Sequence, residues 1–172
     1  MSETLEQVLA LAKAMHTDIQ EYILPPAAGS LSTSDSVIYR SLLKGTRDYI
    51  EQIGHEINGT YENGWYNACA VMIRRLVETL IIETFEAHNL AAKIQNNQGE
   101  FVYLSELVPK CIGEPTWNLS RNAKRSLPKL KDVGDRSAHN RRFLAHRHDI
   151  DNIKTDLRDV AQELLSISKL KT

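Results

Sequence analysis

The sequence predicts an all-α protein, an antiparallel helical bundle with an N-terminal helical extension. Apolar residues recur every three or four positions along most of the chain, which is the spacing of one helix face. Glycine, proline and asparagine gather between these stretches, where they predict turns. The length of 172 residues, with 42% hydrophobic and 25% charged residues, fits a globular protein with a hydrophobic core.

Two parts are expected along the chain, the N-terminal extension over residues 1–60 and the bundle over residues 61–172. Apolar residues on one side predict an amphipathic helix over 3–23, which the prolines that follow would end. The stretch PPAAGSLSTS (25–34) is then a flexible connector.

A second helix is expected from the cap residue Asp35 to about Asn58. Gly45 and Gly54 predict a break or bend within it. The sequence NGTYENG (58–64) predicts the turn that follows this helix.

The strongest apolar pattern predicts a helix over WYNACAVMIRRLVETLIIETFEAHN (65–89). Its apolar face is wide, so this helix is expected at the centre of the core. The positions of that face fall in pairs every three or four residues: Ala68, Cys69, Met72, Ile73, Leu76, Val77, Leu80, Ile81, Thr84 and Phe85.

After a turn at Gln98-Gly99, the stretch FVYLSELVPKCI (101–112) is expected to begin extended and to end as a short helix. Residues 119–133 predict a further helix, with Pro128 near its start or at a kink and with Gly134 as its stop.

A last helix is expected from the cap residue Asp149 or Asp151 to about Leu170. Its expected buried positions are Ile150, Ile153, Leu157, Val160, Ala161, Leu164 and Leu165.

Positive charge is concentrated in one segment of the chain. Residues 1–109 carry 7 Lys/Arg against 14 Asp/Glu, whereas residues 110–148 carry 10 against 3, a net charge of +7. Such a segment suits an anionic partner such as nucleic acid. It can equally face the acidic part of its own fold or of a second copy, and charge alone leaves both interpretations open.

The sequence gives no support for several classes of protein. No run approaches the roughly 18 to 20 apolar residues of a membrane span, and no secretory signal is visible. Cys69 and Cys111 are too few for a disulfide framework, so a reduced, cytoplasmic setting is expected. Nucleotide-binding glycine loops and a Gly-x-Ser-x-Gly nucleophile elbow are missing from the sequence.

The densest group of chemically active side chains lies in GDRSAHNRRFLAHRHD (134–149). His146, His148 and Asp149 could bind a metal, but the neighbouring arginines oppose a dication, so no metal and no cofactor are expected. Arginine binds phosphate oxygens through its planar fork, and histidine exchanges protons near neutral pH. The segment is therefore expected to face phosphate. The alternative is a solvated loop whose arginines pair with acidic side chains.

The stretch YNACAVMIRRLVETLI and the later LPKLKDVGDRSAHNRRFLAHRHDIDNIKTDLRDVAQELL together resemble the HEPN superfamily. They are most similar to a branch of bacterial domains with an Arg-Arg-x-x-Glu element and a later Gly-Asn-x-x-Ala-His element. In this sequence the first element is Arg74, Arg75 and Glu78, and the second runs from Gly134 to His139. The likeness covers about residues 61–170.

The resemblance implies particular site residues. The expected catalytic residues are His139, Arg136, Lys131 and Arg141, and the expected phosphate-binding residues are Arg142, Arg147 and His146. Arg74, Arg75, Glu78 and Asp135 are expected to orient the site or to form a structural ion pair. Lys131 stands where the related branch has arginine, and Asp135 stands where it has asparagine. Lysine keeps the charge but lacks the bidentate fork.

The resemblance also implies a function and partners. Many HEPN proteins are dimeric, metal-independent ribonucleases of bacterial toxin–antitoxin or phage-defence systems. Others have lost catalysis and bind RNA, a nucleotide or a partner protein. The first hypothesis is thus a homodimer that acts on RNA, with metal-independent endoribonuclease activity and an antitoxin or defence partner protein as further expectations. The alternatives are a non-catalytic HEPN-like binding module and a purely structural dimerisation domain.

Overall fold

The computed structural model describes residues 34–171, and Leu31–Thr172 forms one compact unit. The helix expected over 3–23 and nearly all of the connector lie outside the described residues. The described elements are α2 (Arg40–Leu43), α3 (Asp48–Glu62), α4 (Tyr66–Ala87), the 3₁₀ helix η1 (Ala91–Ile94), α5 (Leu104–Gly113), α6 (Arg121–His139), α7 (Arg147–Asp151) and α8 (Lys154–Ile167).

The predicted all-α bundle is confirmed. Within residues 34–171 the one β pairing is an isolated antiparallel bridge between Gln95 and Phe101. It closes the turn at Gly99, as the sequence predicts. No helix among these residues is long and apolar enough to cross a lipid bilayer.

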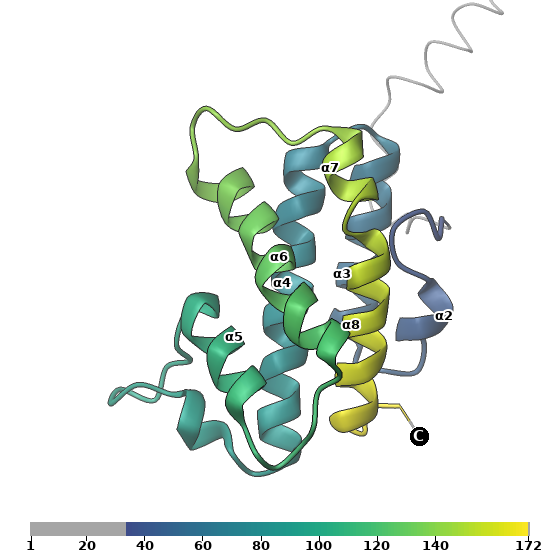
Figure 1. Cartoon of the computed structure of the whole chain (residues 1–172). Helices are drawn as coiled ribbons and strands as arrows, with labels where there is room; N and C mark the ends of the chain where they lie inside the picture. Colours follow the sequence, from purple (N-terminus) through teal and green to yellow (C-terminus); the bar gives the residue numbers. More distant parts are fainter. Residues whose placement is uncertain (1–33, 172) are drawn as a thin grey trace, which may run out of the picture. The chain divides into compact units, whose positions relative to one another are not determined.

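The helix α4 is the centre of the bundle, and it contacts α3, α5, α6, α7, α8 and η1 (Figure 1). Most positions of the predicted apolar face are fully buried, from Cys69 to Phe85. Two predicted positions differ, because Ala68 is exposed and Met72 is only half-buried. Burial on several sides explains why apolar residues recur around so much of this helix.

The helices α2 and α3 replace the single helix predicted from Asp35. The chain breaks at Gly45, whose φ of +83° is the left-handed conformation that glycine adopts without strain. Gly54 does not break α3, which is continuous from Asp48 to Glu62. It lies in the middle of that helix, and any Cβ at this position would collide with the Leu43 side chain of α2. The glycine therefore permits close packing between α2 and α3.

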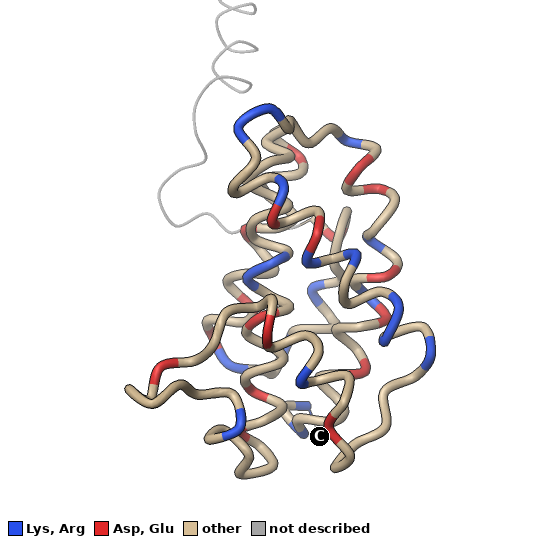
Figure 2. Tube along the Cα trace, turned by 60° about the vertical axis from the view of Figure 1, so that its left-hand side comes forward, with Lys and Arg blue, Asp and Glu red and all other residues tan. Residues whose placement is uncertain are grey.

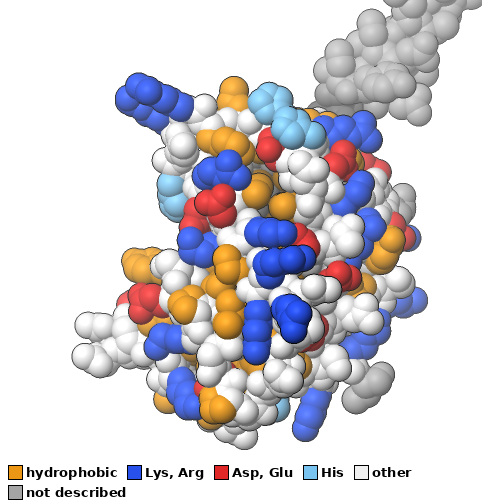
Figure 3. Space-filling view, viewed as in Figure 1, with side chains coloured by type: hydrophobic (Ala, Val, Ile, Leu, Met, Phe, Trp, Pro, Cys, Tyr) orange, Lys and Arg blue, Asp and Glu red, His pale blue; other side chains and the backbone are white. Residues whose placement is uncertain are grey.

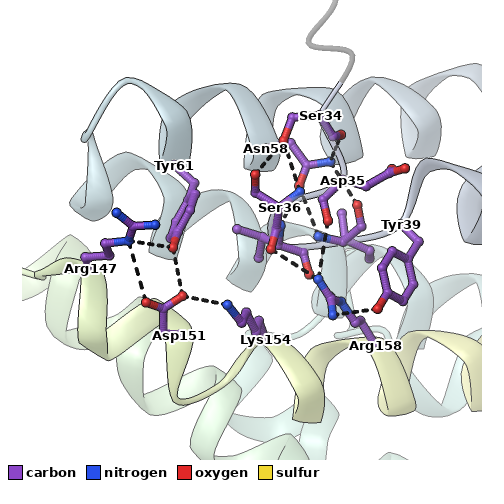
Figure 4. A network of polar contacts seen from close by, with 12 residues as sticks. Ser34, Asp35, Ser36, Tyr39, Asn58, Tyr61, Arg147, Asp151, Lys154 and Arg158 are labelled. Atoms are coloured by element: carbon purple, nitrogen blue, oxygen red, sulfur yellow. Dashed lines mark hydrogen bonds and ion pairs between the residues drawn. The ribbon is translucent and has the colours of Figure 1, made fainter.

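The turn predicted over residues 58–64 is wrong for most of its length, because α3 continues to Glu62. Asn58 is fully buried, and its side chain bonds the segment before α2. Its Oδ1 accepts the backbone N–H groups of Val37 and Ile38, both at 3.0 Å, and its Nδ2 donates to the carbonyls of Ser34 and Ile38 (Figure 4). Asparagine is typical of turns, but here it lies inside a helix and forms tertiary hydrogen bonds.

Gly134 does not stop α6, which runs on to His139. The glycine is buried against α4, and a Cβ built on it would lie 2.5 Å from Arg74 Cβ and 3.1 Å from the carbonyl oxygen of Ala70. Pro128 also lies inside this helix. The ends of α6 are set elsewhere, by Ser120, whose Oγ caps the N–H of Ala123, and by Asn140.

The predicted last helix is divided into α7 and α8 near Asn152, and Asp149 accepts the backbone N–H of His146 at the start of α7. The seven positions expected to be buried are all buried, which confirms the predicted face. The helix α8 packs on both α4 and α6 and so closes the core.

The two tryptophans differ in their surroundings. Trp117 packs edge-on against Phe85, with ring centroids 4.9 Å apart, and lies beside His88. Its Nε1 donates to the carbonyl of Cys111 at 3.1 Å. Trp65, just before α4, is 55% exposed.

Candidate functional site

The candidate site lies at the end of the bundle where α6 ends and a loop leads to α7 (Figure 1). Lys, Arg and His side chains are gathered around this end of the molecule (Figure 3). The site contains the residues of the segment 134–149 together with Arg74 of α4.

Asp135 is the centre of an ion-pair network that joins α6 to α4. Its carboxylate accepts hydrogen bonds from Arg74 Nε at 2.7 Å and from Lys131 Nζ at 2.6 Å. Partial burial alone would raise the pKa of Asp135, but the hydrogen bonds from Lys131 and Arg74 outweigh it and lower the pKa. Lys131, an expected catalytic residue, is therefore held by a carboxylate one turn away.

The expected ion pair within α4 forms with only one of the two arginines. Arg74 Nη1 lies 3.3 Å from Glu78, whereas Arg75 is exposed and pairs with no acidic side chain of the described chain. Arg74 thus bridges Glu78 of its own helix and Asp135 of α6.

Arg136 is also paired within its own helix. Its Nε lies 3.1 Å from Asp132, and its guanidinium lies over the Phe143 ring, 4.7 Å from the centroid. The loop after α6 thereby folds back on the helix. Phe143 carries this contact, and sequence reasoning had assigned it no role.

Arg147, an expected phosphate-binding residue, binds the side chain of Tyr61. Its Nε donates to Tyr61 Oη at 3.0 Å and lies 3.7 Å from Asp151, while Tyr61 donates to Asp151 at 2.7 Å (Figure 4). The hydrogen bond with Tyr61 and the nearby Asp151 raise the pKa of Arg147. The network fixes α7 on α3. Tyr61 is another residue that sequence reasoning missed, because it belonged to a predicted turn.

His146 and His148 lie stacked at the surface, with ring centroids 5.6 Å apart. Asp149 follows His148 in the sequence, and its carboxylate lies 3.8 Å from His146 Nδ1 and 3.5 Å from His148 Nε2. Within residues 34–171 no group of three His, Cys, Asp or Glu side chains is arranged to hold a metal ion.

His139, Arg141 and Arg142 are exposed, and their side chains form no ion pair or hydrogen bond within the described chain. His139 is the last residue of α6, and the arginines lie in the loop that follows. We define the loop surface as His139, Arg141, Arg142, His146 and His148. Within it, the guanidinium groups of Arg141 and Arg142 have no acidic partner in the described chain.

Among the described residues, the Lys and Arg side chains of the basic segment form ion pairs only with acidic residues that follow residue 109 in the chain. Among the ion pairs between described residues, none joins a Lys or Arg of 110–148 to an acidic residue of 34–109. The basic segment pairs instead with its own acidic residues and with those of α7 and α8. Figure 2 shows that Lys and Arg alternate with Asp and Glu over the described part of the trace.

A pocket of about 440 Å³ adjoins the site and was not predicted from the sequence. The oxygen of the Ser137 hydroxyl is buried at this pocket and has no hydrogen-bond partner among the described residues. The other lining residues come from α3 and α4: Glu56, Thr60, Asn67, Ala68, Val71 and Met72.

Neither cysteine belongs to the site. Cys69 and Cys111 are fully buried, and burial raises the pKa of each thiol to about 12. Both thiols are therefore protonated at neutral pH and are poor nucleophiles.

Comparisons with protein-family models, with curated proteins and with solved structures give no match to this chain.

Proposed function

We propose that the protein binds RNA through the loop surface. The observation that carries the proposal is the exposure of Arg141 and Arg142 without any acidic partner in the described chain. Arginine forks bind phosphate oxygens, and an unpaired, exposed guanidinium meets a phosphate without first breaking an ion pair. The HEPN-like sequence elements around His139 also favour RNA as the anion.

Binding has stronger support than cleavage. A ribonuclease of this kind needs a histidine together with a cation fixed where charge develops on the phosphate. Lys131 and Arg136 are the expected cations closest to His139 on α6, and each is paired with a carboxylate.

Metal-independent cleavage is the second candidate function. It is favoured by His139 itself, which is exposed and has no side-chain partner in the described chain. In a homodimer, a second chain would bring its own Arg141 and Arg142 to the vicinity of this histidine. We therefore propose that the functional form is a homodimer.

The binding proposal predicts a loss of RNA affinity in the double variant Arg141→Gln/Arg142→Gln. Affinity for a 16-nucleotide single-stranded RNA falls about tenfold or more, because each lost phosphate contact also removes counterion release. The slope of log affinity against log salt falls by about 1.4, at roughly 0.7 for each cation removed. Fluorescence anisotropy at several salt concentrations measures both quantities.

The matched control is Lys44→Gln/Lys169→Gln, which removes two exposed lysines away from the loop surface. Equal affinities for the two double variants contradict the proposal. Incubation of the same RNA with wild type in EDTA tests cleavage. Products with cyclic-phosphate ends from wild type and none from His139→Ala support an endoribonuclease, whereas intact RNA with both proteins leaves binding as the function.

A further inference from the structure

A second group of unpaired cations lies at the other end of α6. Arg121, Lys124 and Arg125 are exposed, and their side chains form no ion pair or hydrogen bond within the described residues. We call them the α6 start cluster. Lys129, one turn further along, is different because it lies 3.3 Å from Asp156.

The fold gives these three side chains no stabilising role. The N-terminal end of a helix carries partial positive charge, which disfavours cations and attracts anions. The first turn of α6 nevertheless holds no acidic residue. The nearby carboxylate of Glu163 is bound to the backbone N–H and the hydroxyl of Ser120. Three cations therefore remain where the helix itself would favour negative charge.

Arg121 of the α6 start cluster and His139 of the loop surface lie on one side of α6. Arg121 and His139 are the first and last residues of this helix, 18 positions apart. Eighteen residues make five turns at 3.6 residues per turn, so the two residues point the same way, about 27 Å apart along the helix. Lys and Arg side chains follow the outward face of α6 in Figure 3.

The middle of this face is nearly neutral. Asp132 lies 3.1 Å from Arg136, and Lys131 is bound to Asp135. Free positive charge is therefore concentrated at the two ends of the helix, with compensated charge between them.

We propose that α6 is a two-ended binding site for a single RNA chain, with phosphates held by the loop surface at one end and by the α6 start cluster at the other. This inference rests on the proposed function and adds a length requirement to it. A distance of about 27 Å corresponds to roughly eight nucleotides at the 3.4 Å rise of a stacked strand. A mononucleotide or a very short RNA reaches one end only.

The test compares a 4-nucleotide with a 16-nucleotide single-stranded RNA on full-length protein. Wild type binds the longer RNA at least about tenfold more tightly, because the second contact is intramolecular once the first has formed. Arg121→Gln/Arg125→Gln removes most of this length advantage and lowers the salt slope for the 16-mer by about 1.4. The matched control Lys44→Gln/Lys169→Gln keeps both the length advantage and the salt slope of wild type.

Thermal unfolding accompanies the binding assay. Arg121→Gln/Arg125→Gln is expected to unfold at or above the wild-type temperature, because it removes cations from the positive end of a helix. If this variant is as stable as wild type and binds RNA more weakly, the loss of affinity comes from the lost contacts between the α6 start cluster and RNA.

Two outcomes overturn the inference, and they are distinguishable. If wild type binds the 16-mer and Arg121→Gln/Arg125→Gln binds it equally well, RNA binding through the loop surface stands and the two-ended site is wrong. If wild type binds neither RNA, the proposed function fails and this inference fails with it.

Discussion

Gly134 lies buried in α6 against α4, at a position where no side chain fits. The backbone carbonyl of Ala70 and the Cβ of Arg74 occupy the space that a Cβ would need. Glycine inside a helix normally costs about 1 kcal/mol relative to alanine. The close approach of the two helices, and the ion pairs beside it, offset that cost.

We therefore expect Gly134→Ala to destabilise the protein despite the better helix propensity of alanine. Overpacking of a tight contact costs about 1 to 3 kcal/mol, and the propensity of alanine returns about 1 kcal/mol of it, so a net loss of up to about 2 kcal/mol is expected. Urea denaturation followed by circular dichroism measures it. Gly113→Ala is the matched control, since nothing lies within 4 Å of its Cβ position. Equal stability of the two variants would show that the helix contact at Gly134 has room for a Cβ atom.

The sequence could predict the buried faces but not the roles of single residues such as Gly134 and Asn58. Apolar periodicity is a property of many positions together, so a single residue that departs from the pattern does not hide the buried face. Glycine and asparagine have two uses, to end a helix or to serve a tertiary contact within one. Only the partner in space, Ala70 for Gly134 and Val37 for Asn58, decides between these uses.

At the scale of elements, α6 is joined to α4 through Asp135 as well as through packing. The carboxylate pairs with Arg74 of α4 and with Lys131 of its own helix. Because these partners stabilise the charged form, the pKa of Asp135 is lowered in the folded protein. A lowered pKa contributes stability above the pKa of the unfolded chain, and that stability is lost as pH falls through the folded value.

Asp135→Asn is accordingly expected to lower the melting temperature at pH 7. The difference from wild type is constant at neutral pH and shrinks below about pH 4, where protonation removes the wild-type charge as well. Melting curves from pH 3 to pH 7 provide the measurement. Asp132→Asn serves as the control, because the Asp132 side chain is 65% exposed and its pairs are screened by water. A difference in melting temperature between Asp135→Asn and wild type that grows as the pH falls would contradict this prediction.

Element boundaries were harder to predict than element existence. The helix over 65–89, the short helix at the end of 101–112 and the break at Gly45 were found nearly as predicted, whereas the division of the last predicted helix into α7 and α8 was not predicted. The positions expected to be buried in the last helix are all buried despite its division near Asn152, so apolar periodicity carries no signal of that division. Of the site residues, Lys131, Arg136 and Arg147 have acidic neighbours that pair with them, and these pairs depend on side-chain geometry.

At the scale of the whole molecule, several exposed apolar side chains lie near one end of α4. Trp65 is 55% exposed, Leu144 66% and Val71 36%, and Val71 also lines the pocket beside Ser137. The backbone N–H of Ala145 donates to Asn67, which holds the loop that contains Leu144 against α4. Apolar side chains grouped on a surface are typical of interfaces.

If the proposed homodimer forms through this surface, Trp65→Ser/Leu144→Ser shifts the protein toward monomer. The expected change is at least about tenfold in the dimer dissociation constant, which follows from the loss of two apolar anchors. Sedimentation velocity over a range of protein concentrations measures it. Tyr103→Ser is the control, since Tyr103 is 77% exposed and precedes α5. Wild type that stays monomeric at the highest concentration would exclude this interface.

The contrast between the two tryptophans gives the molecule two separate optical reporters. Trp117 is half-buried against Phe85 and His88, whereas Trp65 is mostly exposed to water beside the apolar surface. Their emission should differ in wavelength and in quenching by iodide, since both depend on solvent contact. Replacement of either tryptophan by phenylalanine would leave one fluorophore, so core unfolding and events at the surface could be followed independently in the same protein.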